Sequence, residues 1–138
     1  ILCLVLAVCG FLFATSYFML GAMTSACLNM INIARGLCAS SKRFKNKPFF
    51  VIISLLYVVA TVFTFEGIIS VFLMAAQIIG TWAMFFATPV RIRQLQIFAV
   101  SPIWLINNIF VFSVGGILCE IFTIISSLIF WVRQPLKK

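Results

Sequence analysis

Long apolar segments, separated by short polar or basic connections, make up almost the whole of this 138-residue chain. The first, residues 1–22, carries no charge and is long enough to cross a hydrocarbon core about 30 Å thick. Further segments follow at about 25–41, 49–65, 68–88, 95–112 and 115–133. Their apolar residues run continuously and do not alternate at every second position, which favours helices over barrel strands. The pattern predicts an all-α membrane protein with about six transmembrane helices.

Prolines and basic residues mark the breaks between these segments. The basic run at 42–47 predicts a loop, because five polar residues there interrupt the apolar pattern. Pro89 ends the fourth segment just before Arg91 and Arg93. Pro102 lies inside the fifth segment and predicts a kink in that helix.

Basic residues outside the segments predict the orientation of the chain. They occur in three stretches, at 42–47, 91–93 and 133–138. The three intervening connections, near residues 23, 66 and 114, contain none. Short cytoplasmic loops are enriched in lysine and arginine, so the basic loops and the C-terminus are expected to face the cytoplasm.

Composition supports a lipid environment. The chain is 64% hydrophobic and 9% charged, with a mean hydropathy of +1.26. A soluble domain of this size has too much surface to hide so many apolar side chains. The net charge of +8 lies mostly beside the apolar segments, which favours contact with anionic lipid headgroups over nucleic acid.

Residues for catalysis or metal binding are scarce. The chain has no histidine, and its two acidic residues are Glu66 and Glu120. Five cysteines lie within apolar segments, where cysteine behaves as a small apolar residue. They form no Cys-x-x-Cys motif. Hydrolytic triads, zinc ligand sets and paired carboxylates are therefore absent from the sequence. We expect no enzyme activity, no metal and no cofactor.

Polar side chains inside the apolar segments are the remaining functional signal, because they are costly in hydrocarbon unless they face protein or water. Asn29, Asn32 and Arg35 are spaced three apart and share one helix face. Similar polar stripes occur in the fourth, fifth and sixth segments. Four stripes turned inward would line a hydrated cavity. The candidate substrate-cavity residues are Asn32, Arg35, Gln77, Trp82, Asn108 and Glu120.

Interhelical hydrogen bonding is the competing interpretation, at about 1 kcal/mol for each bond. It is favoured for three hydroxyl groups, those of Thr81, Thr123 and Ser127. A cavity is favoured for Asn32 and Glu120. For Arg35 two arrangements stay open, an ion pair with Glu120 or an extension to the inner membrane surface.

The beginning of the sequence and a faint internal repeat bear on the architecture. The chain begins within an apolar run without an initiator methionine, which predicts one more helix upstream of Ile1. The repeat consists of two motifs, Tyr17-x-x-x-Gly21 before Asn32 and Trp104-x-x-x-Asn108 before Glu120. Two similar helix pairs running in the same direction predict parallel repeats about an axis along the membrane normal.

Three stretches of sequence together resemble the YgjV family of bacterial inner membrane proteins. They are SYFMLGAMTSACLNMINIARGL, IIGTWAMF and WLINNIFVFSVGGILCEIFTIISSLIFWVRQ. The family resembles the PQ-loop and SWEET-like transporters, in which a linker helix joins two three-helix bundles. The resemblance therefore implies a multi-pass protein of the bacterial inner membrane. The family pattern also implies helices two to seven here, with a first bundle at 1–41, a basic loop and linker helix at 42–67, and a second bundle at 68–138.

The same resemblance implies where a solute would bind. SWEET-like carriers line their pocket with an asparagine on the third helix of each bundle. Asn32 matches that position in the first bundle, whereas Glu120 occupies it in the second and argues against a neutral sugar. No Pro-Gln pair is present.

Two functions follow as expectations. The first is a small-solute transporter that holds a polar solute between two helical bundles near mid-membrane. The second is a non-transporting membrane subunit that anchors or regulates a larger complex. The expected partners are the lipid bilayer, a polar small molecule, and a second copy or another membrane chain.

Overall fold

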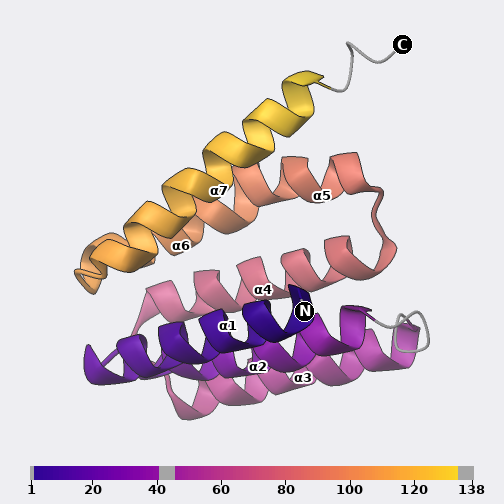
Figure 1. Cartoon of the computed structure of the whole chain (residues 1–138). Coiled ribbons are helices and arrows are strands. Elements are labelled where there is room, and N and C mark those ends of the chain that lie inside the picture. Colours follow the sequence, from indigo (N-terminus) through magenta and orange to yellow (C-terminus); the bar gives the residue numbers. More distant parts are fainter. Residues whose placement is uncertain (1, 41–45, 134–138) are drawn as a thin grey trace.

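The computed structural model describes residues 2–40 and 46–133, and all regular structure within them is helical. The elements are α1 (Leu2–Met19), α2 (Met23–Ser40), α3 (Lys47–Phe63), α4 (Ile68–Phe86), α5 (Pro89–Leu95), η2 (Gln96–Val100), α6 (Ser101–Phe110) and α7 (Val114–Arg133) (Figure 1). The last residue of α5 and the first of α6 join η2 without leaving helical backbone, so residues 89–110 form one long helix. The predicted all-α class is confirmed for this part of the chain.

The long helix of residues 89–110 begins earlier than the sequence predicts. Arg91 and Arg93 were expected in a loop ahead of residue 95, but both lie in α5. Pro89 occupies the first turn, where its fixed φ suits a helix and its missing N–H needs no partner. Residues 41–45 and 134–138, which include most of the other predicted basic stretches, lie outside the described residues.

The irregularity expected at Pro102 takes the form of a π-helical turn. Residues 96–100 make up this turn, immediately before Pro102 in the first turn of α6. The Ser101 amide donates to the Gln96 carbonyl, five residues back. A proline cannot donate to the preceding turn, so a local change of hydrogen-bond register is a common outcome.

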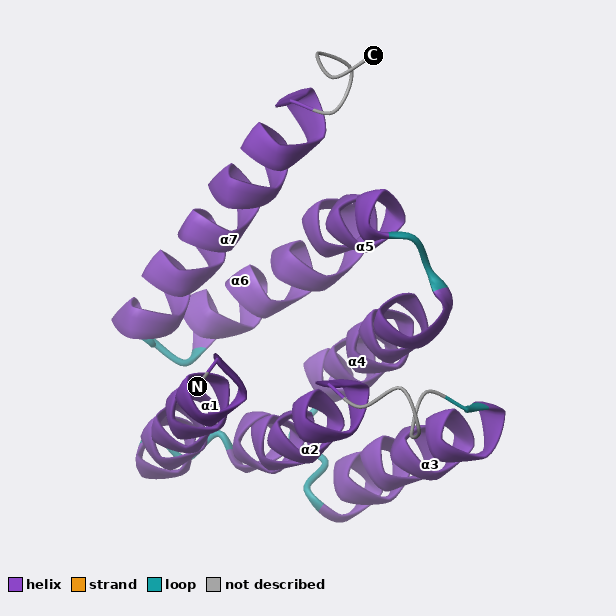
Figure 2. Ribbon diagram, turned by 45° about the vertical axis from the view of Figure 1, so that its right-hand side comes forward, coloured by secondary structure: helices purple, strands orange, loops and turns teal. Residues whose placement is uncertain are grey.

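Successive long helices reverse direction, so that their connections collect at two ends. Residues 20–22, 64–67 and 111–113 turn at one end, while the 87–88 connection and the C-terminal end of α7 lie at the other (Figure 1). Seen from another side, α1 to α4 lie together below the hairpin formed by α5, α6 and α7 (Figure 2). Helix α4 contacts α2 and α3 and also α5, η2 and α6, so it joins the two groups.

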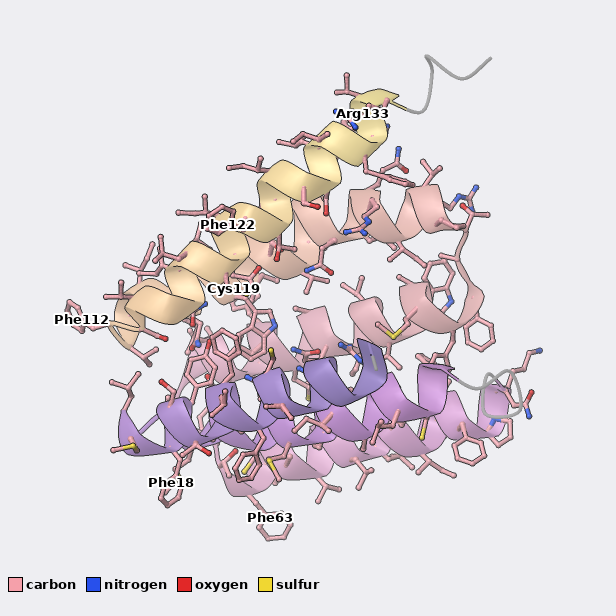
Figure 3. All side chains as sticks on the ribbon, in the orientation of Figure 1. Phe18, Phe63, Phe112, Cys119, Phe122 and Arg133 are labelled. Atoms are coloured by element: carbon pink, nitrogen blue, oxygen red, sulfur yellow. The ribbon has the colours of Figure 1, made fainter. Side chains whose placement is uncertain are left out.

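Large apolar side chains cover the outside, whereas many polar side chains are inside. Phe63 and Phe112 are 84% and 85% exposed and, with Phe18, extend outward from the ribbon (Figure 3). Gln77 and Asn108, in contrast, are among the fully buried side chains. This distribution is the one expected when lipid, and not water, surrounds the helices.

Helix length and composition can be compared with the predicted spans. Two described helices, α4 and α7, are long and apolar enough to cross a membrane. Helix α3 and residues 8–19 of α1 are apolar but shorter. The polar stripe of α2 and the arginines of α5 lower the hydropathy of those helices, so the six-span arrangement stays a prediction.

The turns that end α1 and α6 have the same hydrogen bonding. The amide of Ala22 donates to the carbonyl of Tyr17, and the amide of Ser113 donates to that of Asn108, each over 2.9 Å. Aligned on these bonds, Tyr17 and Asn108 are equivalent and lie 91 positions apart. Applied to Glu120, the same spacing selects Asn29, three residues before the Asn32 that the predicted repeat assigned. The turns therefore do not support the pairing of Asn32 with Glu120 on which the predicted repeat rests.

Candidate functional site

Arg35 of α2 reaches across to two polar side chains of α4. Its Nη1 atom donates to Gln77 Oε1 over 3.1 Å and to Thr81 Oγ1 over 3.4 Å. The Thr81 hydroxyl in turn donates to the backbone carbonyl of Gln77. Gly80 faces the same guanidinium, and a Cβ added there would lie 3.4 Å from Nη1. The arginine therefore lies against α4 beside Gly80.

A tyrosine from α3 completes this group. Tyr57 is fully buried and donates its hydroxyl proton to Asn32 Oδ1 over 2.7 Å. Asn32 and Arg35 lie on one face of α2, as their spacing predicts, and Arg35 lies within electrostatic reach of the tyrosine. We call Asn32, Arg35, Tyr57, Gln77 and Thr81 the Arg35 cluster. Its three helices bring together three of the six candidate residues.

Hydrogen bonding leaves the guanidinium of Arg35 partly unsatisfied. Its Nε atom is shielded from the surface and has no hydrogen-bond partner within the described residues. The acceptors that Arg35 does have, on Gln77 and Thr81, are neutral. Of the two arrangements left open by the sequence, the ion pair with Glu120 is not formed.

Asn108 belongs to a second group, where α6 meets α1 and α7. The Tyr17 hydroxyl donates to Asn108 Oδ1, and the ring of Tyr17 lies 5.9 Å from that of Trp104. Asn108 is 1% exposed, and a Cβ added at Gly116 would come within 2.5 Å of its Oδ1. We call Tyr17, Trp104, Asn108 and Gly116 the Asn108 cluster. This cluster is closed on all sides by direct contacts.

The neighbouring asparagine strengthens the same connection. Asn107 Nδ2 donates to Ser25 Oγ over 3.0 Å, and both side chains are buried. Two consecutive asparagine side chains of α6 are therefore hydrogen-bonded to α1, through Tyr17, and to α2, through Ser25.

The two other candidates lie apart from both clusters. Glu120 of α7 lies close to Ser101, and its Oε2 is buried and has no partner within the described residues. Ser101 accepts a hydrogen bond from Gln96 over 3.0 Å. Trp82 is 43% exposed on the outer surface of α4.

Comparison with known proteins identifies the family. The family model of Imp-YgjV, described as a bacterial inner membrane protein, matches residues 1–138. The chain belongs to the Imp-YgjV family. Comparisons with curated proteins and with solved structures give no match. Membership places this Imp-YgjV protein in the bacterial inner membrane, which agrees with its exposed apolar surface.

Sequence reasoning missed the role of Glu66 in this Imp-YgjV protein. Its carboxylate accepts the backbone amides of Met23 over 2.7 Å and Thr24 over 3.3 Å. These are the first amides of α2, where a negative charge satisfies unpaired donors and complements the helix dipole. An acidic residue in a connection gave no signal of this role, because its partners lie more than forty positions away. The connection between α3 and α4, which carries Glu66, lies at the end of the molecule opposite to the C-terminal end of α7 (Figure 1).

Tyr57 was also missed, although a signal existed. It is a lone tyrosine in the middle of an apolar helix, and a buried tyrosine usually finds a hydrogen-bond partner. Nothing in the sequence pointed to Asn32 as that partner.

Two apolar grooves lie on the outer surface of this Imp-YgjV protein. One, of about 720 Å³, runs between α4 and α6 and is lined by residues 66–69 and 72 with Ile103, Ile106 and Phe110. The other, of about 270 Å³, lies between α1 and α2 and is lined by Ala14, Thr15, Phe18, Ala26, Cys27 and Met30. None of the six candidate residues lines either groove.

Proposed function

We propose that this Imp-YgjV protein is a small-solute transporter of the SWEET-like type, which acts by binding and releasing a polar solute without catalysis. One observation carries the proposal: the Arg35 cluster borders the π-helical turn. A Cβ at Gly80 would lie 3.4 Å from Arg35 Nη1 and 3.5 Å from Val100 of η2. A solute beside Arg35 would therefore contact helices on both sides of α4.

The proposed solute site has two walls, one on each side of the place where Gly80 of α4 lies beside Val100 of η2. Asn32, Arg35 and Gln77 form the first wall. Glu120 forms the second, because it lies close to Ser101, which directly follows Val100 in the chain. A π-helical turn supplies a point where hydrogen-bond register can change, which is the kind of element that alternating access requires. In this proposal Asn108 has a structural role, because its hydrogen bond with Tyr17 joins α6 to α1.

Uptake into proteoliposomes tests the proposal. The purified full-length protein would be reconstituted, exposed to an isotope-labelled bacterial metabolite extract, and the vesicle contents analysed by mass spectrometry. We expect at least one polar solute to accumulate with the wild type and not with Arg35→Gln. Arg93→Gln is the matched control, because Arg93 lies on α5 and contacts Ser127 and Phe130 instead. Equal vesicle contents for the wild type and empty liposomes would contradict transport.

The multi-pass topology is part of the proposal. The basic ends of the helices are assigned to the cytoplasm because short cytoplasmic loops carry the positive charge. In a cysteine-free background, a cysteine at Arg91 should react only from the cytoplasmic side. One at Phe112, which is 85% exposed, should react only from the opposite side. Labelling of both positions from the same side would overturn this orientation.

A non-transporting membrane subunit is the second candidate. Asn107 donates a hydrogen bond to Ser25 of α2, and Asn108 accepts one from Tyr17 of α1. These bonds fix the two helix groups to each other, which suits a rigid scaffold. The groove between α1 and α2 offers a surface for a second copy or another membrane helix. Stable co-purification with one partner chain, together with an absence of uptake, would favour this function.

A further inference from the structure

We infer that the Arg35 cluster binds an oxyanion, a carboxylate or phosphate group of the ligand. The inference deepens the proposed function, on which it rests for its biological meaning, by naming the chemical class that the site takes. It stands on the hydrogen bonding of Arg35 and on the positions of the acidic residues.

One edge of the guanidinium makes no hydrogen bond to the described residues. An arginine carries five N–H donors, and its Nε–H and Nη2–H point in one direction as a pair. In Arg35 only Nη1 donates to described residues, and Nε is enclosed without a partner. Such a pair matches the two oxygens of a carboxylate or phosphate.

The charge of Arg35 has no counter-ion among the described residues. The chain has two acidic side chains. Glu66 binds the first amides of α2, and Glu120 lies with Ser101 on the other side of η2. A charged group within an apolar helical protein normally pairs with an opposite charge, so a bound anion supplies what this site lacks.

The surroundings of Arg35 fit an anion better than a cation. Tyr57 donates a hydrogen bond to Asn32 Oδ1, and Arg35 donates one to Gln77 Oε1. The side-chain NH₂ group of each amide is therefore the remaining donor. The Thr81 hydroxyl donates to the backbone carbonyl of Gln77 and accepts a hydrogen bond from Arg35 Nη1. Gly80 adds no bulk beside the guanidinium.

Thermal unfolding of the purified full-length protein tests the inference. The probes are inorganic phosphate and succinate, with succinamide as the neutral analogue and sodium chloride at equal ionic strength. We expect phosphate or succinate to raise the melting temperature of the wild type, while succinamide and chloride do not. Absence of any anion-specific shift in the wild type would overturn the inference, whatever the variants do.

Variants assign the effect to Arg35. Arg35→Gln should abolish the shift, and Arg35→Lys should weaken anion binding about tenfold or more because the paired donors are lost. Arg93→Gln should bind like the wild type. The lysine variant keeps the charge and serves if the glutamine variant does not fold. A shift of the same size in Arg35→Lys and Arg35→Gln as in the wild type would overturn the assignment.

A lipid headgroup and a soluble anion share this chemistry, and two nanodisc compositions separate them. If the oxyanion belongs to a lipid, phosphatidylglycerol in place of phosphatidylcholine should stabilise the wild type but not Arg35→Gln, and should reduce the effect of added phosphate. If it belongs to a soluble ligand, the shift should be the same in both lipids. Arg35-dependent anion binding without uptake into proteoliposomes would refute the transporter and leave this inference intact.

Discussion

The Arg35 cluster and the Asn108 cluster are both polar groups inside apolar helices, yet they differ in how far their hydrogen-bonding groups are satisfied. Asn108 is enclosed, its carbonyl oxygen is bonded to Tyr17, and Gly116 packs directly against it. Arg35 keeps a buried Nε without a partner and a charge without a counter-ion among the described residues. A cluster that is already satisfied holds helices together, whereas an unsatisfied one has bonding capacity left for a ligand.

The glycines of the two clusters show the same difference. A Cβ at Gly116 would overlap the Asn108 amide at 2.5 Å, but a Cβ at Gly80 would meet Arg35 Nη1 at 3.4 Å. The first distance is far below van der Waals contact, and the second is close to it. Packing is therefore tighter at Gly116, beside Asn108, than at Gly80, beside Arg35.

The largest expected effect is that of Gly116→Ala. The new methyl group would displace the Asn108 side chain, which has no free space to move into, and we expect a loss of about 2–3 kcal/mol in the free energy of unfolding. Gly115→Ala is the matched control, because a Cβ there meets nothing within 4 Å. Reversible unfolding in bicelles measures both. Equal effects of the two substitutions would show that the Asn108 cluster is not tightly packed.

Tyr17→Phe should have the next largest effect. It removes the donor to Asn108 Oδ1 and leaves that buried oxygen unpaired, at a cost of about 1–2 kcal/mol. Tyr57→Phe is the comparison in the other cluster, and it should cost less because Asn32 is only half-buried. The same unfolding measurement gives both values. A larger loss for Tyr57→Phe would reverse the proposed contrast.

Gly80→Ala should change stability by about 1 kcal/mol or less, in the favourable direction. Alanine suits the interior of α4 better than glycine, and its methyl group fits beside Arg35 with a small adjustment. The shift in melting temperature relative to Gly116→Ala measures the difference between the clusters. A destabilisation as large as that of Gly116→Ala would show that the Arg35 cluster is packed just as tightly.

Arg35→Gln should have the smallest effect on stability, within about 0.5 kcal/mol of zero. The lost hydrogen bonds to Gln77 and Thr81 are offset by removal of an uncompensated charge from the helix interior. The melting temperature without added anions measures this balance. A strong destabilisation would place Arg35 among the structural residues and weaken its assignment as a binding residue.

Particular residues show how far the site could be predicted. The i, i+3 spacing of Asn32 and Arg35 correctly gave one shared helix face, because that relation is local. Gln77 was recognised as a polar residue of an apolar helix, but its contact with Arg35 was not predicted. Glu66 was treated as the end of a segment, and its binding to α2 could not be foreseen because its partners lie more than forty positions away, at the start of another helix.

The sequence by itself determined that this is a helical chain with an apolar surface, since hydropathy and helical spacing act over one or two turns and can be read locally. It also located the breaks, although Pro89 began a helix where a loop was expected. Only the tertiary structure decided which polar groups are satisfied. The partner of Arg35 lies 42 positions away and that of Tyr17 lies 91 away. Whether a buried donor finds an acceptor depends on such distant helices meeting at the right depth, which no local pattern specifies.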